Sequence, residues 1–151
     1  MKNQMPVCTG ISNCIILSID EKDWHGIRGR VYHAYSEEGI PIGSFEQVIR
    51  IAEELFNDLG YPQMTTNDRD FSGGSHSYRK KEEMVRVMDE KTLLEQRGDL
   101  GTFTIRVQHR QHSSWQGKVT WLEKDETVYF RSALELIKLI DSVIEKNKLG
   151  E

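Results

Sequence analysis

Six side chains in the last third of the sequence could together bind phosphate groups or the edges of nucleobases. Apolar residues alternate over residues 103–107, as in a half-buried strand, so the residues between them would point to the opposite face. The same alternation continues along residues 115–121 and 127–130. The candidate binding residues are Arg106, Arg110, Gln116, Lys118, Tyr129 and Arg131. Guanidinium and ammonium groups bind phosphate, and an amide can both donate to and accept from a base edge.

The charge of the chain leaves the role of this basic face open. The formal net charge is -4, and residues 103–151 carry eight basic against seven acidic side chains. Strong non-specific binding to nucleic acid needs a larger basic excess over some surface. The face could therefore be solvated, could be covered by the acidic first half of the chain, or could contact another subunit.

Other residues with chemical potential lack the spacing that their chemistry requires. His109 and His112 would need a further ligand to hold a metal ion, and the cysteines, Cys8 and Cys14, have no second pair for a zinc site. We expect both cysteines to be free thiols, and the alternative is a redox pair. The sequence has no phosphate-binding loop, dinucleotide fingerprint, nucleophile elbow or zinc-protease motif. We therefore predict no catalytic residues, no metal and no cofactor.

A comparison of the sequence with itself predicts the elements that position the candidate face. A shift of 88 residues places residues 15–57 on residues 103–145, with few identities but a similar apolar pattern. Each copy has the element order β-β-β-α, and the alternative to duplication is chance similarity between two strand-and-helix segments. The predicted strands are residues 15–19, 27–33 and 40–42 in the first copy and 103–107, 115–121 and 127–130 in the second.

Each copy ends in a helix with a clear start. Ser44 precedes Gln47 by three residues, and Ser132 precedes Glu135 in the same way, so each pair predicts a capping box. Apolar residues then recur at helical spacing in wide stripes. Stripes of this width indicate that each helix contacts more than its own sheet.

These patterns predict an α+β fold: an internal duplication of a β-β-β-α unit with antiparallel strands and with helices packed on one face. We expect a single globular domain whose two modules span about residues 14–60 and 102–147. A polar linker, residues 61–101, joins the modules, and residues 79–97 could form an additional helix. The modules would pair helix on helix or edge on edge, because a unit of this size is marginal alone.

The repeat gives the tryptophans counterparts that predict their burial. Trp115 lies opposite Ile27, so we expect it in the core. Trp121 lies opposite His33 at a strand end, where an amphipathic ring is often half-buried. Trp24 has no apolar counterpart, and we expect it to be exposed.

Residues 110–141 resemble a family of small proteins from anaerobic gut bacteria that share R-Q-x-x-S-W-Q-G-x-V-x-W followed by F-R-S-x-L-E-L. The matching residues are Arg110, Gln111, Ser114, Trp115, Gln116, Gly117, Val119, Trp121, Phe130, Arg131, Ser132, Leu134, Glu135 and Leu136. The stretch GRVYHAYSEEGIPIGSFEQV in the first half is similar to that family as well. The family has no established activity, so the resemblance implies a single duplicated unit and no mechanism.

The order β-β-β-α also resembles that of the DNA-binding domain of plant ethylene-response factors and of the arm-binding domain of phage integrases. Both use an exposed sheet face in the major groove. The resemblance is one of element order, and a shared fold does not imply a shared function.

Together these features predict a small cytoplasmic protein that is a non-enzymatic binding or regulatory module. Its apolar runs are too short for a membrane span, and its first residues lack the apolar core of a secretion signal. We expect its partner to be another protein or a second copy of itself. The alternative function is nucleic-acid binding through the basic face, and a third hypothesis is small-molecule binding between the two modules.

Overall fold

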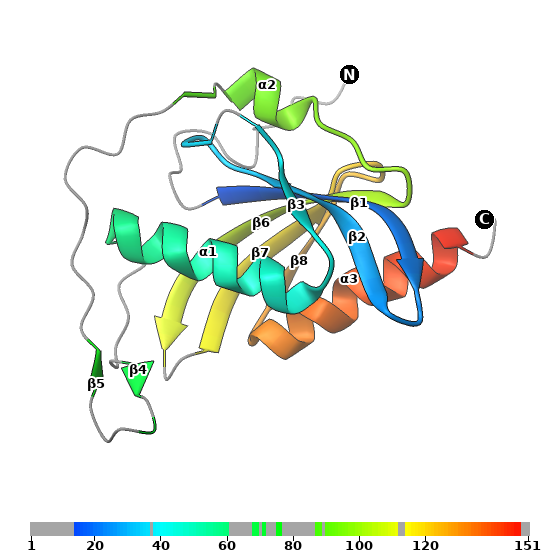
Figure 1. The fold of residues 1–151 in the computed structure, drawn as a ribbon. Coiled ribbons are helices and arrows are strands. Elements are labelled where there is room, and N and C mark those ends of the chain that lie inside the picture. The colour runs from blue at the N-terminus through cyan, green and yellow to red at the C-terminus, as the bar shows by residue number, and fades with distance from the viewer. Residues whose placement is uncertain are drawn as a thin grey trace.

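The computed structural model describes residues 14–36, 38–60, 68–69, 71, 75–76, 87–88, 90–111 and 114–148. Six antiparallel strands form one sheet in the order β3-β2-β1-β6-β7-β8, and two long helices cover one face of it (Figure 1). The strands are β1 (Cys14–Asp23), β2 (Gly26–Tyr32), β3 (Ile40–Ile42), β6 (Gly101–Gln111), β7 (Ser114–Trp121) and β8 (Glu126–Phe130), and the helices are α1 (Phe45–Leu59) and α3 (Ala133–Lys148). The predicted α+β class, with antiparallel strands and helices on one face, is confirmed.

Three short elements lie between the two halves of the chain. Strands β4 (Asp68–Arg69) and β5 (Ser75–His76) pair with each other and not with the main sheet. Helix α2 (Glu90–Leu94) accounts for part of the helix expected over residues 79–97. The rest of that helix falls largely on residues outside the described ones, as do Cys8 and His112. Within the described residues, no helix has the length and apolar character needed to cross a membrane.

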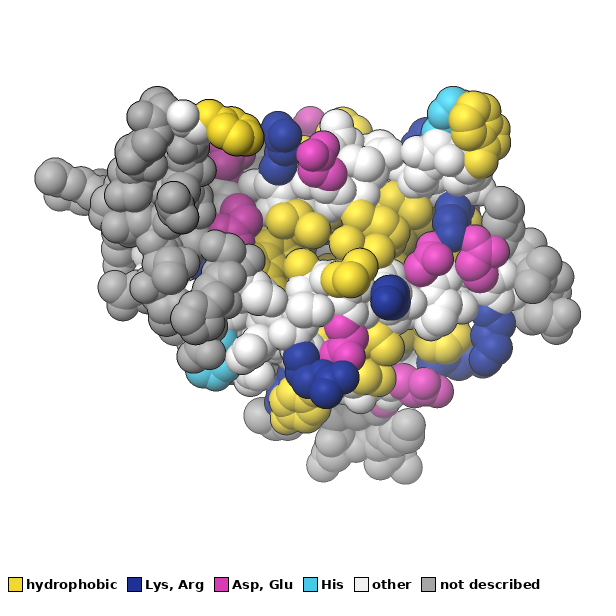
Figure 2. Space-filling model, turned by 90° about the horizontal axis from the view of Figure 1, so that it is seen from below, with side chains coloured by type: hydrophobic (Ala, Val, Ile, Leu, Met, Phe, Trp, Pro, Cys, Tyr) yellow, Lys and Arg dark blue, Asp and Glu magenta, His cyan; other side chains and the backbone are white. Residues whose placement is uncertain are grey.

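The core lies between the sheet and the two long helices. Alternate residues of the central strands, such as Leu17 on β1 and Ile105 on β6, are fully buried on the face that α1 and α3 cover. Trp115 is 1 % exposed and packs edge to face on Phe56 of α1, which confirms the expected core position. On the outer side of this helical layer, hydrophobic side chains gather in the middle and charged ones lie around them (Figure 2). Trp24, as expected, is exposed at the β1–β2 turn.

The two halves have equivalent strand registers. Leu17 pairs with Val31 across β1 and β2, and Ile105 pairs with Val119 across β6 and β7. Both residues of the second pair lie 88 positions after those of the first. The outer pairs β2–β3 and β7–β8 obey the same rule over three residues. The halves join edge on edge through β1 and β6, where Ile16 pairs with Thr104, the residue 88 positions later. The edge-on-edge arrangement was one of the two that the sequence left open.

The same irregularity interrupts the first strand of each half. The register of β1 shifts at Asp20 and that of β6 shifts at Gln108, again 88 positions apart. Such a β-bulge inserts one extra residue and bends the strand. Gly29 and Gly117 lie opposite the two bulges, where an added Cβ would stand 1.9 and 2.0 Å from a backbone carbonyl oxygen of the neighbouring strand.

Both helix starts carry the predicted caps. Ser44 Oγ accepts a hydrogen bond from Gln47 N at 3.2 Å, and Ser132 Oγ accepts one from Glu135 N at 3.0 Å. The Gln47 and Glu135 side chains return to the backbone N–H of the residue before the cap, one position earlier than expected.

The second face of the sheet has a smaller apolar cluster. Ile16 and Tyr32 pack there with Leu93 of α2, together with Cys14 and Ala34. Cys14 is buried and disulfide-bonded, so the expected free thiol at this position was wrong.

Candidate functional site

Arg110 does not lie on the face that the strand alternation predicts. The bulge at Gln108 reverses the alternation, so Arg110 shares the helix-covered face with Trp115, its partner in the register. The guanidinium is 2 % exposed and donates from Nη1 to Glu53 Oε2 at 3.0 Å and to Asn57 Oδ1 at 2.9 Å, both on α1. Arg110 is therefore part of the core packing between β6 and α1 and is not available to a ligand on the opposite face.

Lys22 makes the equivalent contact in the other half. It follows the β1 bulge and reaches Asp141 and Glu145 of α3. Burial lowers the pKa of Lys22, but hydrogen bonds and charge from the two carboxylates outweigh that effect and raise it overall. In each half, the cation after the bulge thus contacts the helix of the other half.

Four of the predicted binding residues do lie on the second face of the sheet. Arg106 pairs in register with Lys118, and Lys118 pairs with Tyr129. The ammonium of Lys118 lies 5.1 Å from the centre of the Tyr129 ring, and Tyr129 itself is 65 % exposed. Gln116 lies on the same face of β7 and is partly buried.

The sixth residue, Arg131, lies beyond the end of β8. Its Nη2 atom donates to Glu135 Oε2 at 2.9 Å in the cap of α3. This contact raises the pKa of Arg131 and lowers that of Glu135, in both cases chiefly through the side-chain hydrogen bond. The basic face therefore keeps Arg106 and Lys118 and loses two of its four predicted cations.

The middle of the second face is polar and closed to solvent. Ser18, Thr104 and Thr120 are fully buried there. Thr120 shares a 2.7 Å hydrogen bond with Thr127. Within the described residues, the Ser18 and Thr104 hydroxyls and the Arg106 Nε have no hydrogen-bond partner. A buried unsatisfied group costs about 1–3 kcal/mol. The face is thus not the continuous open basic surface that nucleic-acid binding would use.

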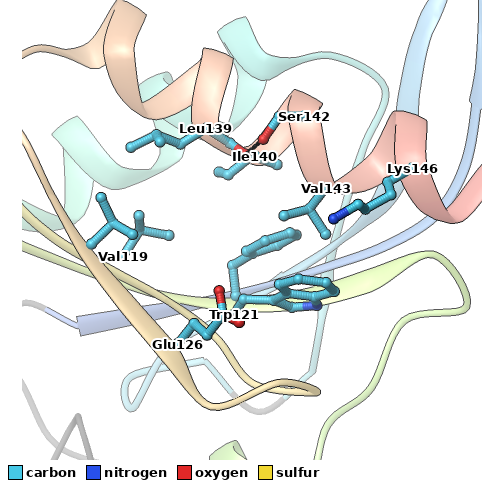
Figure 3. Close-up of a pocket in the computed structure, with 10 residues that line it drawn as sticks. Val119, Trp121, Glu126, Leu139, Ile140, Ser142, Val143 and Lys146 are labelled. Carbon is cyan, nitrogen blue, oxygen red and sulfur yellow. Dashed lines mark hydrogen bonds between the residues drawn. The ribbon is translucent and has the colours of Figure 1, made fainter.

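A cavity of about 330 Å³ lies between α3 and the β8 end of the sheet. Figure 3 shows side chains of α3, among them Leu139, Val143 and Lys146, opposite Val119 and Trp121 of the sheet. Most of the wall is apolar, and its polar members are Glu126, Ser142 and Lys146. Its full lining is Phe103, Val119, Trp121, Glu126, Val128, Leu139, Ile140, Ser142, Val143 and Lys146.

Two charged residues, Glu126 and Lys146, line this pocket. Glu126 is on β8 and Lys146 is on α3, and neither forms an ion pair within the described part of the chain. An apolar pocket with a few polar groups at its border is typical of a ligand-binding or peptide-binding site.

The pocket adjoins an outer edge of the six-stranded sheet. Strand β8 is the last strand in the sheet order, and its residues Glu126 to Tyr129 are all exposed. Val128 lines the pocket and is 44 % exposed. At the opposite edge, β3 has three residues, and its central residue is Pro41, which has no N–H to donate.

The sequence contained only a weak signal for this pocket. Leu139 widens the apolar stripe of the second helix, which indicated a contact beyond the core of the sheet. Glu126 and Lys146 were not singled out, because their convergence depends on how α3 lies over β7 and β8.

Comparisons with family models, curated proteins and solved structures found no match to this chain.

Proposed function

We propose that this protein is a non-enzymatic binding module that acts through protein–protein contacts. Its contact site is the groove between α3 and β8, by which we mean the cavity described above together with the exposed β8 edge beside it. The observation that carries the proposal is the apolar cavity of about 330 Å³ beside a strand edge that pairs with no other strand among the described residues. An extended segment of a partner would add to β8 as a further strand and would place an apolar side chain in the cavity. This is the geometry of strand addition, in which main-chain hydrogen bonds give affinity and side-chain pockets give specificity.

The arrangement of the groove supports this mode of binding. Side chains of an added strand alternate between the two faces of the sheet, so every second one would point toward α3. There it would meet Leu139 and Val143 on the helix and Val128 on the strand. The exposed polar atoms of the β8 backbone would gain partners at the same time.

The nucleic-acid alternative receives less support from the geometry. Arg110 is buried on the opposite face, and Arg131 is paired with Glu135. The two cations that remain, Arg106 and Lys118, are neighbours, and Lys118 lies on the Tyr129 ring. Two cations supply little of the phosphate neutralisation on which such binding depends.

We also propose that the two halves arose by internal duplication. Support comes from the features that recur after 88 residues: the strand registers, the two bulges, the facing glycines, the serine caps and the contacts of Lys22 and Arg110 with the opposite helix. Chance similarity of two strand-and-helix units does not readily reproduce a bulge and its facing glycine at the same offset.

Selection of binders from a displayed library of random peptides tests the function. We expect the purified protein to enrich peptides with apolar residues at alternate positions. Ser142→Trp, which places a bulky ring at the border of the cavity, should abolish their binding. Lys138→Trp is the matched control, because Lys138 is exposed on the same helix but does not line the cavity.

Two results would overturn the proposal. One is the absence of any enriched peptide with the wild-type protein. The other is peptide binding that survives Ser142→Trp unchanged while both variants keep the wild-type circular dichroism spectrum.

A further inference from the structure

We propose that the groove is occupied by a second copy of this chain, with β8 of one copy paired antiparallel to β8 of the other. This inference rests on the proposed function, since it names the partner of the same site. The result would be a two-fold symmetric dimer in which two six-stranded sheets join into one. Closed two-fold symmetry is the commonest form of self-association among soluble oligomers.

The exposure of β8 is the first argument. Val128 and Tyr129 are 44 % and 65 % exposed on an edge strand that contains neither proline nor lysine. Leu134, in the first turn of α3 shortly after β8, is 61 % exposed as well. A strand edge that exposes large apolar side chains tends to pair with another strand, and Glu126 is the single charged residue on β8. A second copy of the chain is the partner that is always present at equal concentration.

The charged residues in and next to β8 are compatible with antiparallel pairing of β8 with β8 of a second copy. Antiparallel pairing centred on Val128 sets Val128 against Val128 of the second copy and Thr127 against its Tyr129. Opposite residues of antiparallel strands lie on the same face of the sheet, so the apolar contact forms at the mouth of the cavity. Glu126 then lies opposite Phe130 of the second copy and next to its Arg131. No like charges face each other in this register, which is the electrostatic condition for self-pairing.

The first half provides a built-in comparison. Its edge strand, β3, is shorter than β8 and carries Pro41 at the position equivalent to Tyr129. Proline removes a hydrogen-bond donor from the edge, so strand addition there is blocked. Self-association through the sheet should therefore use β8 alone and should stop at the dimer.

Light scattering coupled to size exclusion, over a dilution series, measures the outcome. We expect a mass of twice 17.5 kDa at high concentration and a shift to the monomer on dilution. Val128→Lys should raise the dissociation constant by roughly tenfold or more, because it places two ammonium groups face to face at the centre of the interface. Ile40→Lys changes the equivalent residue of β3 and is the matched control, expected to leave the mass unchanged.

A second variant and a second measurement address folding. Tyr129→Asp changes a largely exposed side chain on the other face of β8, so it should weaken the dimer without disturbing the core. Amide hydrogen exchange should show that the β8 backbone is protected more strongly at high than at low concentration.

Three outcomes would overturn the inference: a monomer at every concentration, a dimer insensitive to both β8 variants, or a dimer broken equally by Ile40→Lys. A monomer that still binds selected peptides in a manner sensitive to Ser142→Trp would leave the proposed function intact. A monomer that binds none would remove both.

Discussion

The two halves of the sheet share a framework but differ at their outer edges. In the first half, the edge strand β3 is short and carries Pro41, and His33, the residue directly after β2, is buried. In the second half, β8 is longer and exposed, and Trp121 takes the position equivalent to His33 as one wall of a cavity. The shared features hold the strands in place, whereas the differing features leave β8 as the longer and more exposed edge, which is the edge that the proposed function uses. Binding is therefore best sought where the halves differ.

The contacts between each strand and the opposite helix give the sharpest comparison of the two halves. Arg110 is 2 % exposed, and its acceptor Glu53 also accepts a hydrogen bond from the Trp115 indole. The equivalent acid, Asp141, is 42 % exposed and shares Lys22 with Glu145. The cations are 2 % and 16 % exposed and the acids 28 % and 42 %, so the Arg110–Glu53 contact is the more buried of the two.

Removal of these two acids should have unequal effects. We expect Glu53→Ala to lower the free energy of unfolding by about 3 kcal/mol, because it leaves a buried guanidinium without its carboxylate. Asp141→Ala should cost less than about 1 kcal/mol, since water screens the pair and Glu145 remains. Urea unfolding followed by tryptophan fluorescence measures both. Equal losses would mean that the two contacts are energetically alike, in spite of their different burial.

The glycines that face the bulges should behave alike. Gly29→Ala and Gly117→Ala would each place a Cβ within about 2 Å of a backbone carbonyl oxygen, Ser18 O and Arg106 O respectively. We expect each change to cost about 2 kcal/mol, within the usual range for overpacking. The same urea experiment tests this, with Gly43→Ala as the control, because its Cβ would stand 3.5 Å from its nearest neighbour. A large loss at one glycine with none at the other would break the equivalence of the two bulges.

Much of this framework was predictable from local patterns. Alternation marks the strands, and Ser44 and Ser132 mark the helix starts, because both signals depend on neighbouring residues. Arg110 was placed on the wrong face because one extra residue in a strand reverses all that follow it, and alternation carries no record of a bulge. The one indication in the sequence was that Gly29 and Gly117 occur at equivalent positions, 88 residues apart.

The pocket was beyond such reasoning for a different reason. Glu126 and Lys146 lie on a strand and a helix that meet only through tertiary packing. Neither residue stands in a spacing that demands the other. An edge strand can also be recognised only once the order of all six strands is known.

The smallest expected difference between the halves concerns pH. Burial lowers the pKa of His33 below its usual value of 6.5, while Trp121 at the equivalent position does not titrate. The folded state therefore favours the neutral ring, whose Nδ1 accepts a hydrogen bond from Tyr35 N at 3.1 Å. The stability that this ring contributes is present above the unfolded pKa and is lost as the pH falls through it toward the folded pKa.

Urea unfolding between about pH 7.5 and about pH 5 should show this decline in the free energy of unfolding, and His33→Gln should flatten it. If His33→Gln left the pH dependence of the free energy of unfolding unchanged, His33 would not be the source of that dependence, and the two halves would not differ in this respect.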